Sequence, residues 1–158
     1  MLKNLLFFIS IILATGMVLT LIFGQEEPAG LGLNNGRLTP CQAELKCVSS
    51  QSDDPDRRVE PLTVPTNVID PMAKLAMVLR GIKGVTVVKE EDNYLRARFY
   101  GKLLWIKSDL ELFYDPSAGV VHVRSASRLG RCDFGANREM VEKIRGLFSP
   151  DRAYLPAS

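Results

Sequence analysis

The stretch from Arg124 to Arg138 combines residue types that bind anions. A predicted strand ends in Arg-Ser-Ala-Ser-Arg at positions 124–128, a glycine-containing turn follows, and a helix is expected to begin near Asn137. Hydroxyl groups, guanidinium groups and the free amide groups of a helix N-terminus therefore meet in one short connection, which favours negative charge. We predict a site for a small anion, such as a phosphate or carboxylate headgroup. Its candidate residues are Asp109, Arg124, Ser125, Ser127, Arg128, Asp133, Asn137 and Arg138.

The same residues also have a purely structural interpretation. Arg124 or Arg128 would pair with Asp109 or Asp133, and Asp133 or Asn137 would cap the helix. Substitution of Arg128 by alanine distinguishes the two, because a ligand site would lose binding and keep stability, whereas a structural turn would lose folding.

A thiol-dependent enzyme is a further hypothesis. Cys47, His122 and either Asp109 or Asp133 supply the residue types of a thiol triad. A single histidine in the middle of a strand is more often a packed or surface residue, however, and no Walker, Rossmann or metalloprotease motif is present. Because His122 is the only histidine, no metal site and no cofactor are predicted. The sequence favours a non-enzymatic binding or accessory module over an enzyme.

Cys41 and Cys47 lie six residues apart, and Cys132 is remote from both. A Cys41–Cys47 disulfide would close a small loop in an oxidising compartment. Two reduced or separately buried thiols are the alternative, and the spacing alone leaves both open.

The elements that position these residues follow from apolar periodicity. Asp70-Pro71 is typical of an N-cap and first helical residue, and apolar residues follow at spacings of three and four up to Ile82. Strands are predicted at 85–90, 94–100, 103–114 and 120–127, joined by short turns, and a last helix at 137–148. Residues 38–69 show no period. The predicted fold is α+β, an antiparallel four-stranded sheet with two helices packed on one face.

Residues 5–23 contain no charged residue. As a helix these 19 residues would extend about 28 Å, close to the roughly 30 Å hydrocarbon core of a bilayer. We therefore expect residues 1–24 to be a transmembrane anchor in contact with the bilayer, with a cleaved signal peptide as the alternative. Lys3 on one side and two glutamates on the other predict a single-pass protein. Its N-terminus would be cytoplasmic and its domain on the periplasmic or lumenal side.

The remaining organisation is a flexible linker at 25–37, one domain at 38–150 and a C-terminal tail at 151–158. Twenty basic and 18 acidic residues give a net charge of +2, which does not favour a nucleic-acid partner. The expected partner is an unidentified envelope protein or a small anionic ligand.

Two stretches carry a family resemblance. One is Cys41–Ser50 followed by Val59-Glu60-Pro61, and the other joins Asp109-Leu110-Glu111 to the signature at 124–138. Over residues 38–148 they resemble domain-of-unknown-function family 1499. The resemblance implies an envelope or plastid protein with an N-terminal membrane or signal segment, and it implies no established reaction.

Overall fold

The chain forms an α+β domain preceded by a helix. The structure, a computed structural model, describes residues 2–23, 26–42, 46–101 and 106–149. Its helices are α1 (Leu2–Phe23), α2 (Pro71–Gly81) and α3 (Ala136–Phe148). Its strands are β1 (Leu33–Asn34), β2 (Arg37–Leu38), β3 (Cys47–Ser49), β4 (Leu62–Thr63), β5 (Val85–Glu91), β6 (Tyr94–Tyr100), β7 (Lys107–Asp115) and β8 (Val120–Ser127). The predicted tail at 151–158 and positions 103–105 of the third predicted strand lie outside the described residues.

Antiparallel pairing joins six strands of the described residues into one sheet. The order is β3-β8-β7-β6-β5, and β4 pairs with β8 as well. The predicted four-stranded sheet is therefore wrong, although the α+β class and the antiparallel direction agree with the structure. β3 has three residues and β4 has two, so neither strand is long enough to show the alternation by which a strand is predicted.

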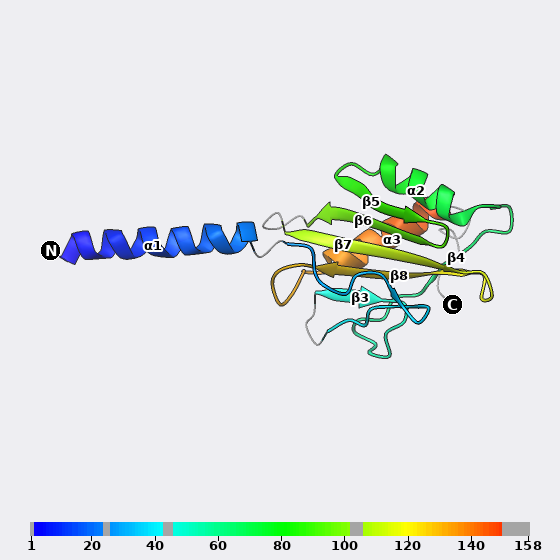
Figure 1. The fold of residues 1–158 in the computed structure, drawn as a ribbon, viewed down its shortest axis with the longest axis horizontal. Coiled ribbons are helices and arrows are strands. Elements are labelled where there is room, and N and C mark those ends of the chain that lie inside the picture. The colour runs from blue at the N-terminus through cyan, green and yellow to red at the C-terminus, as the bar shows by residue number, and fades with distance from the viewer. Residues whose placement is uncertain (1, 24–25, 43–45, 102–105, 150–158) are drawn as a thin grey trace.

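Helices α2 and α3 cover one face of this sheet (Figure 1). Helix α2 begins as predicted, because the Asp70 carboxylate accepts a hydrogen bond from the Ala73 main-chain N–H at 2.9 Å, and proline takes the first position. The apolar stripes of both helices pack on apolar strand residues, and together they form the core. Its fully buried members include Leu75, Leu79, Leu95, Leu110, Leu112, Val121, Val123, Val141, Ile144 and Phe148.

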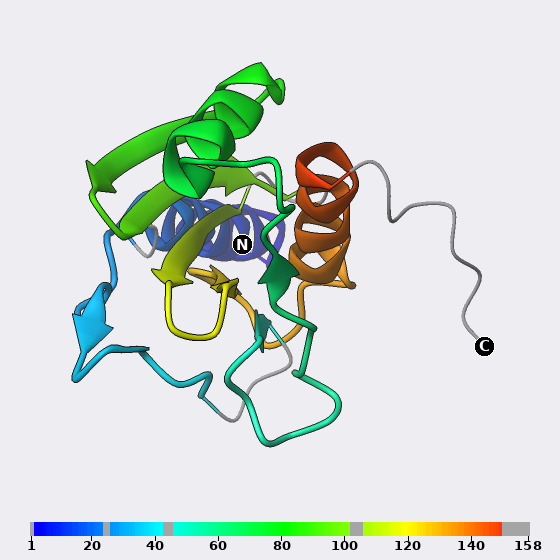
Figure 2. The same ribbon diagram turned by 90° about the vertical axis from the view of Figure 1, so that its right-hand side faces the viewer.

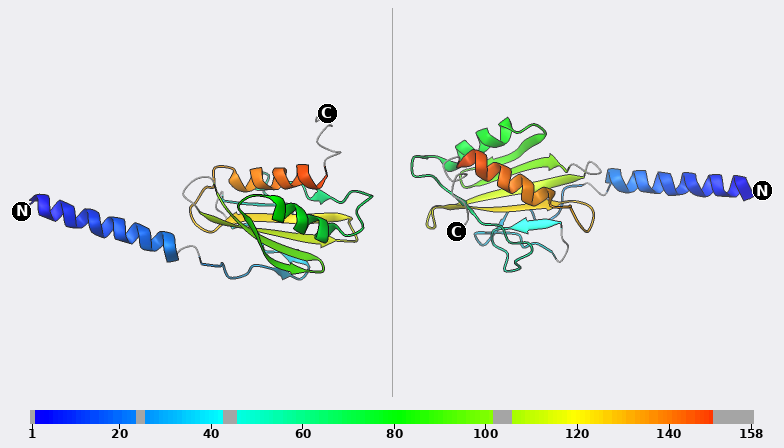
Figure 3. Two further views of the ribbon diagram at one scale, coloured as in Figure 1. Left: turned by 90° about the horizontal axis from the view of Figure 1, so that it is seen from above. Right: turned by 180° about the vertical axis from the view of Figure 1, so that it is seen from behind.

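Residues 26–42 run along the opposite face of the sheet, and we call them the strap. Figure 3 (left) shows the sheet between the two helices and this segment, and Figure 2 shows the strap and α3 on opposite sides of the strands. The Gly32 main-chain N–H donates to Glu111 Oε1 at 2.7 Å, and Arg96 forms an ion pair with Glu27. The described part of the predicted linker, residues 26–37, thus includes strand β1, the first residue of β2 and contacts to the sheet.

The structure contradicts the predicted transmembrane anchor. Among the described residues, no helix is both long and apolar enough to cross a membrane. The single-pass location, with a cytoplasmic N-terminus and an exported domain, depended on that anchor and is overturned with it.

Candidate anion-binding pocket

The Arg-Ser-Ala-Ser-Arg sequence at 124–128 divides its side chains between the two faces of the sheet. Residues 124–127 lie in strand β8, and the Arg128 N–H continues the pairing by donating to the Lys107 carbonyl at 2.9 Å. Successive side chains of a strand point to opposite faces. Ser125 and Ser127 therefore face the helices, and Arg124, Ala126 and Arg128 face the strap. The sequence-predicted site is thus split by the sheet itself.

On the helix face, the two serines form a buried hydrogen-bond network with α3. The Ser125 hydroxyl donates to Asn137 Oδ1 at 2.6 Å, and Asn137 Nδ2 donates to Ser127 Oγ at 3.0 Å and to the Lys46 carbonyl at 2.9 Å. Ser125 and Asn137 are completely buried. These residues join the first turn of α3 to the sheet, so their role in the structure is packing and orientation of that helix.

Asp133 belongs to the same helix terminus. Its Oδ2 accepts the Asn137 main-chain N–H at 2.8 Å, and its Oδ1 accepts the Gly135 N–H at 3.1 Å. The N-cap residue of α3 is Gly135, so Asp133, two positions earlier, binds the first turn of the helix from outside it. Arg138, the residue after Asn137 in α3, donates to the main-chain carbonyls of Arg58 and Asp56 at 2.8 and 2.9 Å. Neither residue lies with the arginines of β8.

On the strap face, Arg128 and Asp109 form a buried bidentate ion pair. Arg128 Nε donates to Oδ2 at 2.7 Å and Nη2 donates to Oδ1 at 2.8 Å. The two side chains are only 4% and 2% exposed. The hydrogen bond to Asp109 raises the pKa of the Arg128 guanidinium above its ordinary value, so the cation is firmly held at this position.

Glu111 is a second buried carboxylate on the strap face. It accepts hydrogen bonds from Arg124 Nη1 and from the Tyr94 hydroxyl, each at 2.8 Å, in addition to the one from Gly32. Burial, followed by the neighbouring Glu111 charge, raises the pKa of Tyr94, so its hydroxyl stays protonated and donates. Arg124 Nε is also buried, and it has no hydrogen-bond partner among the described residues.

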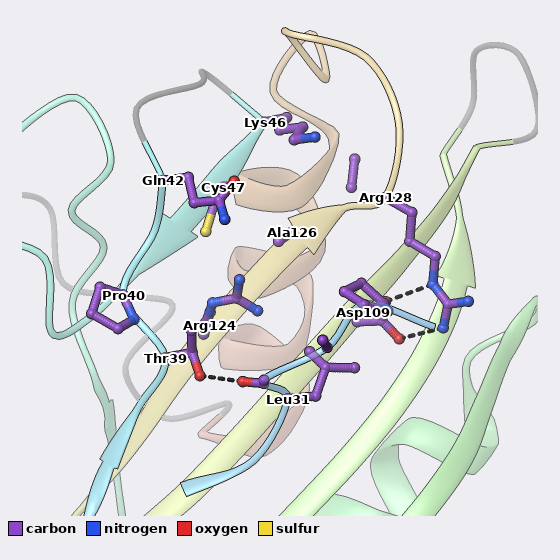
Figure 4. A pocket seen from close by; sticks show the side chains of 14 residues that line it. Leu31, Thr39, Pro40, Gln42, Lys46, Cys47, Asp109, Arg124, Ala126 and Arg128 are labelled. Carbon is purple, nitrogen blue, oxygen red and sulfur yellow. Dashed lines mark hydrogen bonds and ion pairs between the residues drawn. The ribbon is translucent and has the colours of Figure 1, made fainter. Parts of the chain in front are cut away.

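A pocket of about 190 Å³ lies between these arginines and the strap (Figure 4). Ala126 forms its floor, and the cross-strand register places Cys47 on one side of Ala126 and Asp109 on the other. Arg124 and Arg128 line it two positions before and after Ala126 on the same strand. The strap contributes the opposite wall with Pro28, Ala29, Gly30, Leu31, Thr39, Pro40 and Gln42, and Lys46 and Ser127 complete the lining.

A disulfide between Cys41 and Cys47 ties the strap to β3, and its Cα atoms are 5.6 Å apart. It settles the alternative that the spacing left open. It also removes the thiol-triad hypothesis, because Cys47 has no free thiol. His122 instead has its Nδ1 3.2 Å from Ser50 Oγ and stacks on Phe113. Burial lowers the pKa of His122. Cys132 is free and exposed.

Three of the predicted site residues line the pocket with side chains on the strap face, namely Asp109, Arg124 and Arg128; Ser127 borders it as well, although its hydroxyl accepts a hydrogen bond from Asn137 on the helix face. Sequence reasoning missed the floor at Ala126 and the whole strap wall. A signal for Ala126 was present, since the alternation of β8 assigns it to the same face as the two arginines. Apart from Cys41 and Gln42, which belong to the Cys41–Ser50 motif, no periodicity or motif indicated the strap residues. Among the described residues, no group of histidine, cysteine or acidic side chains could hold a metal ion.

The fold and the site define a small α+β domain with a disulfide-tethered strap over a pocket lined by buried ion pairs. Residues 37–148 match the family described as protein of unknown function (DUF1499), and the chain belongs to this family. No curated protein and no solved structure matches the chain. The matched range includes the sheet, both packed helices and the disulfide, whereas Pro28–Leu31 of the pocket wall precede it.

Proposed function

We propose that this domain is a non-enzymatic binding module that holds a small anionic ligand in the strap pocket. The observation that carries the proposal is the placement of Arg124 and Arg128 on either side of the small Ala126, at the floor of a ligand-sized cavity. The serines of the predicted site are excluded from this proposal, because they are committed to α3 on the other face of the sheet.

Arg124 is the donor that supports ligand binding most directly. Its guanidinium has five N–H donors, and its buried Nε–H has no partner among the described residues. The Nε atom itself is not exposed to the pocket. An anionic oxygen would therefore form its charge-assisted hydrogen bond with the part of the Arg124 side chain that lines the pocket, since this side chain is 11% exposed. Arg128 would then act chiefly through its charge, since two of its nitrogens already bind Asp109.

Substitution of Ala126 by leucine tests the proposal, because three additional carbon atoms would occupy the floor of the pocket and leave every ion pair in place. The matched control is Ala118→Leu, the same change in the exposed β7–β8 turn. Binding of acetate and of inorganic phosphate would be measured on the full chain at constant ionic strength. Chemical shifts of the Arg124 Nε–H and the Ala126 amide are the readout, and urea unfolding monitors stability.

We expect the Arg124 Nε–H signal to shift saturably with at least one of the two anions in the wild-type and Ala118→Leu proteins. In Ala126→Leu the same shift should be lost, and the free energy of unfolding should remain within about 1 kcal/mol of wild type. The proposal is refuted if neither anion shifts this signal in the wild-type protein, or if the leucine variant at position 126 retains the response.

A further inference from the structure

The strap pocket combines charged and apolar walls in a way that points to one class of anion. Resting on the function proposed above, we infer that the ligand is a monocarboxylate with a compact apolar body, rather than inorganic phosphate or another multiply charged anion. The inference depends on three properties of the pocket: the carboxylates beside its arginines, the apolar residues of its walls and its volume.

The carboxylates limit the charge that the pocket can accept. Arg128 is already paired with Asp109, and Arg124 with Glu111. Asp109 itself lines the pocket and is 2% exposed, and Glu111, two positions further along β7, is completely buried. Repulsion between buried like charges grows as the local dielectric falls. A ligand with two or more negative charges would be repelled more strongly by these carboxylates, whereas a carboxylate ligand brings one delocalised charge and two acceptor oxygens.

The walls suit an apolar body. Pro28, Ala29, Leu31 and Pro40 of the strap face Ala126 on the sheet, and the disulfide sulfur of Cys47 closes one side. A phosphate ion needs donors around all of its oxygens, and apolar walls would leave part of it without hydrogen bonds. For an organic acid the same walls become favourable contacts, because each buried methylene raises affinity about fourfold.

The volume sets the size of the body. A dry protein cavity of about 150 Å³ holds a benzene molecule, which has six carbon atoms. The pocket of about 190 Å³ therefore has room for roughly seven or eight non-hydrogen atoms by the same measure. A branched five-carbon acid such as isovalerate, with seven such atoms, is a suitable probe.

The inference is tested by calorimetric titration of the full chain with four probes at constant pH and ionic strength: isovalerate, its neutral analogue isovaleramide, acetate and inorganic phosphate. We expect isovalerate to bind at least about tenfold more tightly than acetate, with a ceiling near 60-fold for three buried carbons. Isovaleramide and phosphate should bind more weakly than isovalerate. Ala126→Leu should abolish isovalerate binding, and Ala118→Leu should retain it.

A second pair of variants locates the apolar body against the strap. Leu31→Ala removes part of the pocket wall. It should lower the affinity for isovalerate several-fold and leave the affinity for acetate unchanged. Leu33→Ala is the matched control, because Leu33 is exposed and does not line the pocket, and it should leave both affinities unchanged. Equal losses for the two acids in Leu31→Ala would overturn the placement of the apolar body at this wall.

The outcomes separate this inference from the proposed function. Phosphate or acetate binding as tightly as isovalerate, with loss in Ala126→Leu, would overturn the apolar monocarboxylate and leave an anion pocket in place. Isovaleramide binding as tightly as isovalerate would overturn the need for negative charge, and with it both proposals. Failure of all four probes to bind would also overturn both.

Discussion

Substitution of Asn137 by alanine should destabilise the domain and leave the strap pocket intact. The Asn137 side chain is completely buried at the start of α3. It accepts the Ser125 hydroxyl hydrogen at 2.6 Å and donates to Ser127 Oγ and the Lys46 carbonyl. All of these bonds lie on the helix face of the sheet, and the arginines of the pocket lie on the other face.

The magnitude follows from the groups left behind. The Ser125 hydroxyl would be buried without the acceptor it now has, at a cost of about 1–3 kcal/mol, and each further lost hydrogen bond removes about 0.5–1.5 kcal/mol. Partial relaxation around the site reduces the sum, so we expect the free energy of unfolding to fall by about 3 kcal/mol. For a domain of this size, that corresponds to a decrease in melting temperature of roughly 10–20 °C.

Urea unfolding of the wild-type and variant chains measures this change, with the exposed turn residue Asn93→Ala as the matched control. The double variant Ser125→Ala/Asn137→Ala should cost about 1–2 kcal/mol less than the sum of its single variants, because removal of both partners leaves no orphaned hydroxyl. A change below about 0.5 kcal/mol in Asn137→Ala, accompanied by loss of anion binding, would refute the structural role and restore Asn137 to the ligand site.

Three further predictions concern the strap face. Asp109→Asn should lower the free energy of unfolding by about 3–5 kcal/mol in urea, because it leaves the buried Arg128 cation without its counter-charge; a loss below about 1 kcal/mol would contradict this. Cys41→Ser/Cys47→Ser should lower the free energy of unfolding by about 2 kcal/mol, the entropy of a loop closed over six residues. The same double variant should bind anions more weakly in the Arg124 Nε–H titration. Unchanged binding would show that the strap needs no covalent tether. Burial lowers the pKa of His122 below its ordinary value of 6.5, so the contribution of His122 to stability is complete above that pH and is lost as the pH falls below it. Between pH 7.5 and 5.5, the free energy of unfolding in urea should therefore decrease less in His122→Gln than in the wild-type protein. An equal decrease in the two proteins would contradict the lowered pKa of His122.

The long strands and the two packed helices were predictable because each shows its period. Residues 94–100 alternate apolar and charged side chains, and the proline after Asp70 marks the beginning of α2. β3 and β4 were not predictable, since strands of three and two residues contain no full alternation. Their positions are fixed by pairing with β8, which is a tertiary contact.

Only the part of the candidate site that lies on long strands could be predicted from the sequence. Residues 124–138 were predicted to form one site because they are close together along the chain, and this proximity placed the serines and the arginines in one group. The period of two in β8 separates them, and it was already visible at Val121, His122, Val123 and Arg124. If this alternation is continued from Arg124 to Arg128, it assigns Ser125 and Ser127 to the side of the sheet that faces the core. The strap wall could not be found this way, because residues 28–40 have no period and are held by Gly32, Leu38 and the disulfide.

One strand segment therefore carries two independent tasks. Its serines hold α3 against the sheet through Asn137, and its arginines, paired with Asp109 and Glu111, line the pocket under the strap. The sheet separates the two groups of side chains, and the links between them are Ser127 and Lys46, which bond to Asn137 and also border the pocket. Loss of ligand binding in a Ser125 variant would thus be a consequence of lost stability. Substitutions of the pocket-lining residues of this segment and of the strap are the ones expected to report on ligand binding.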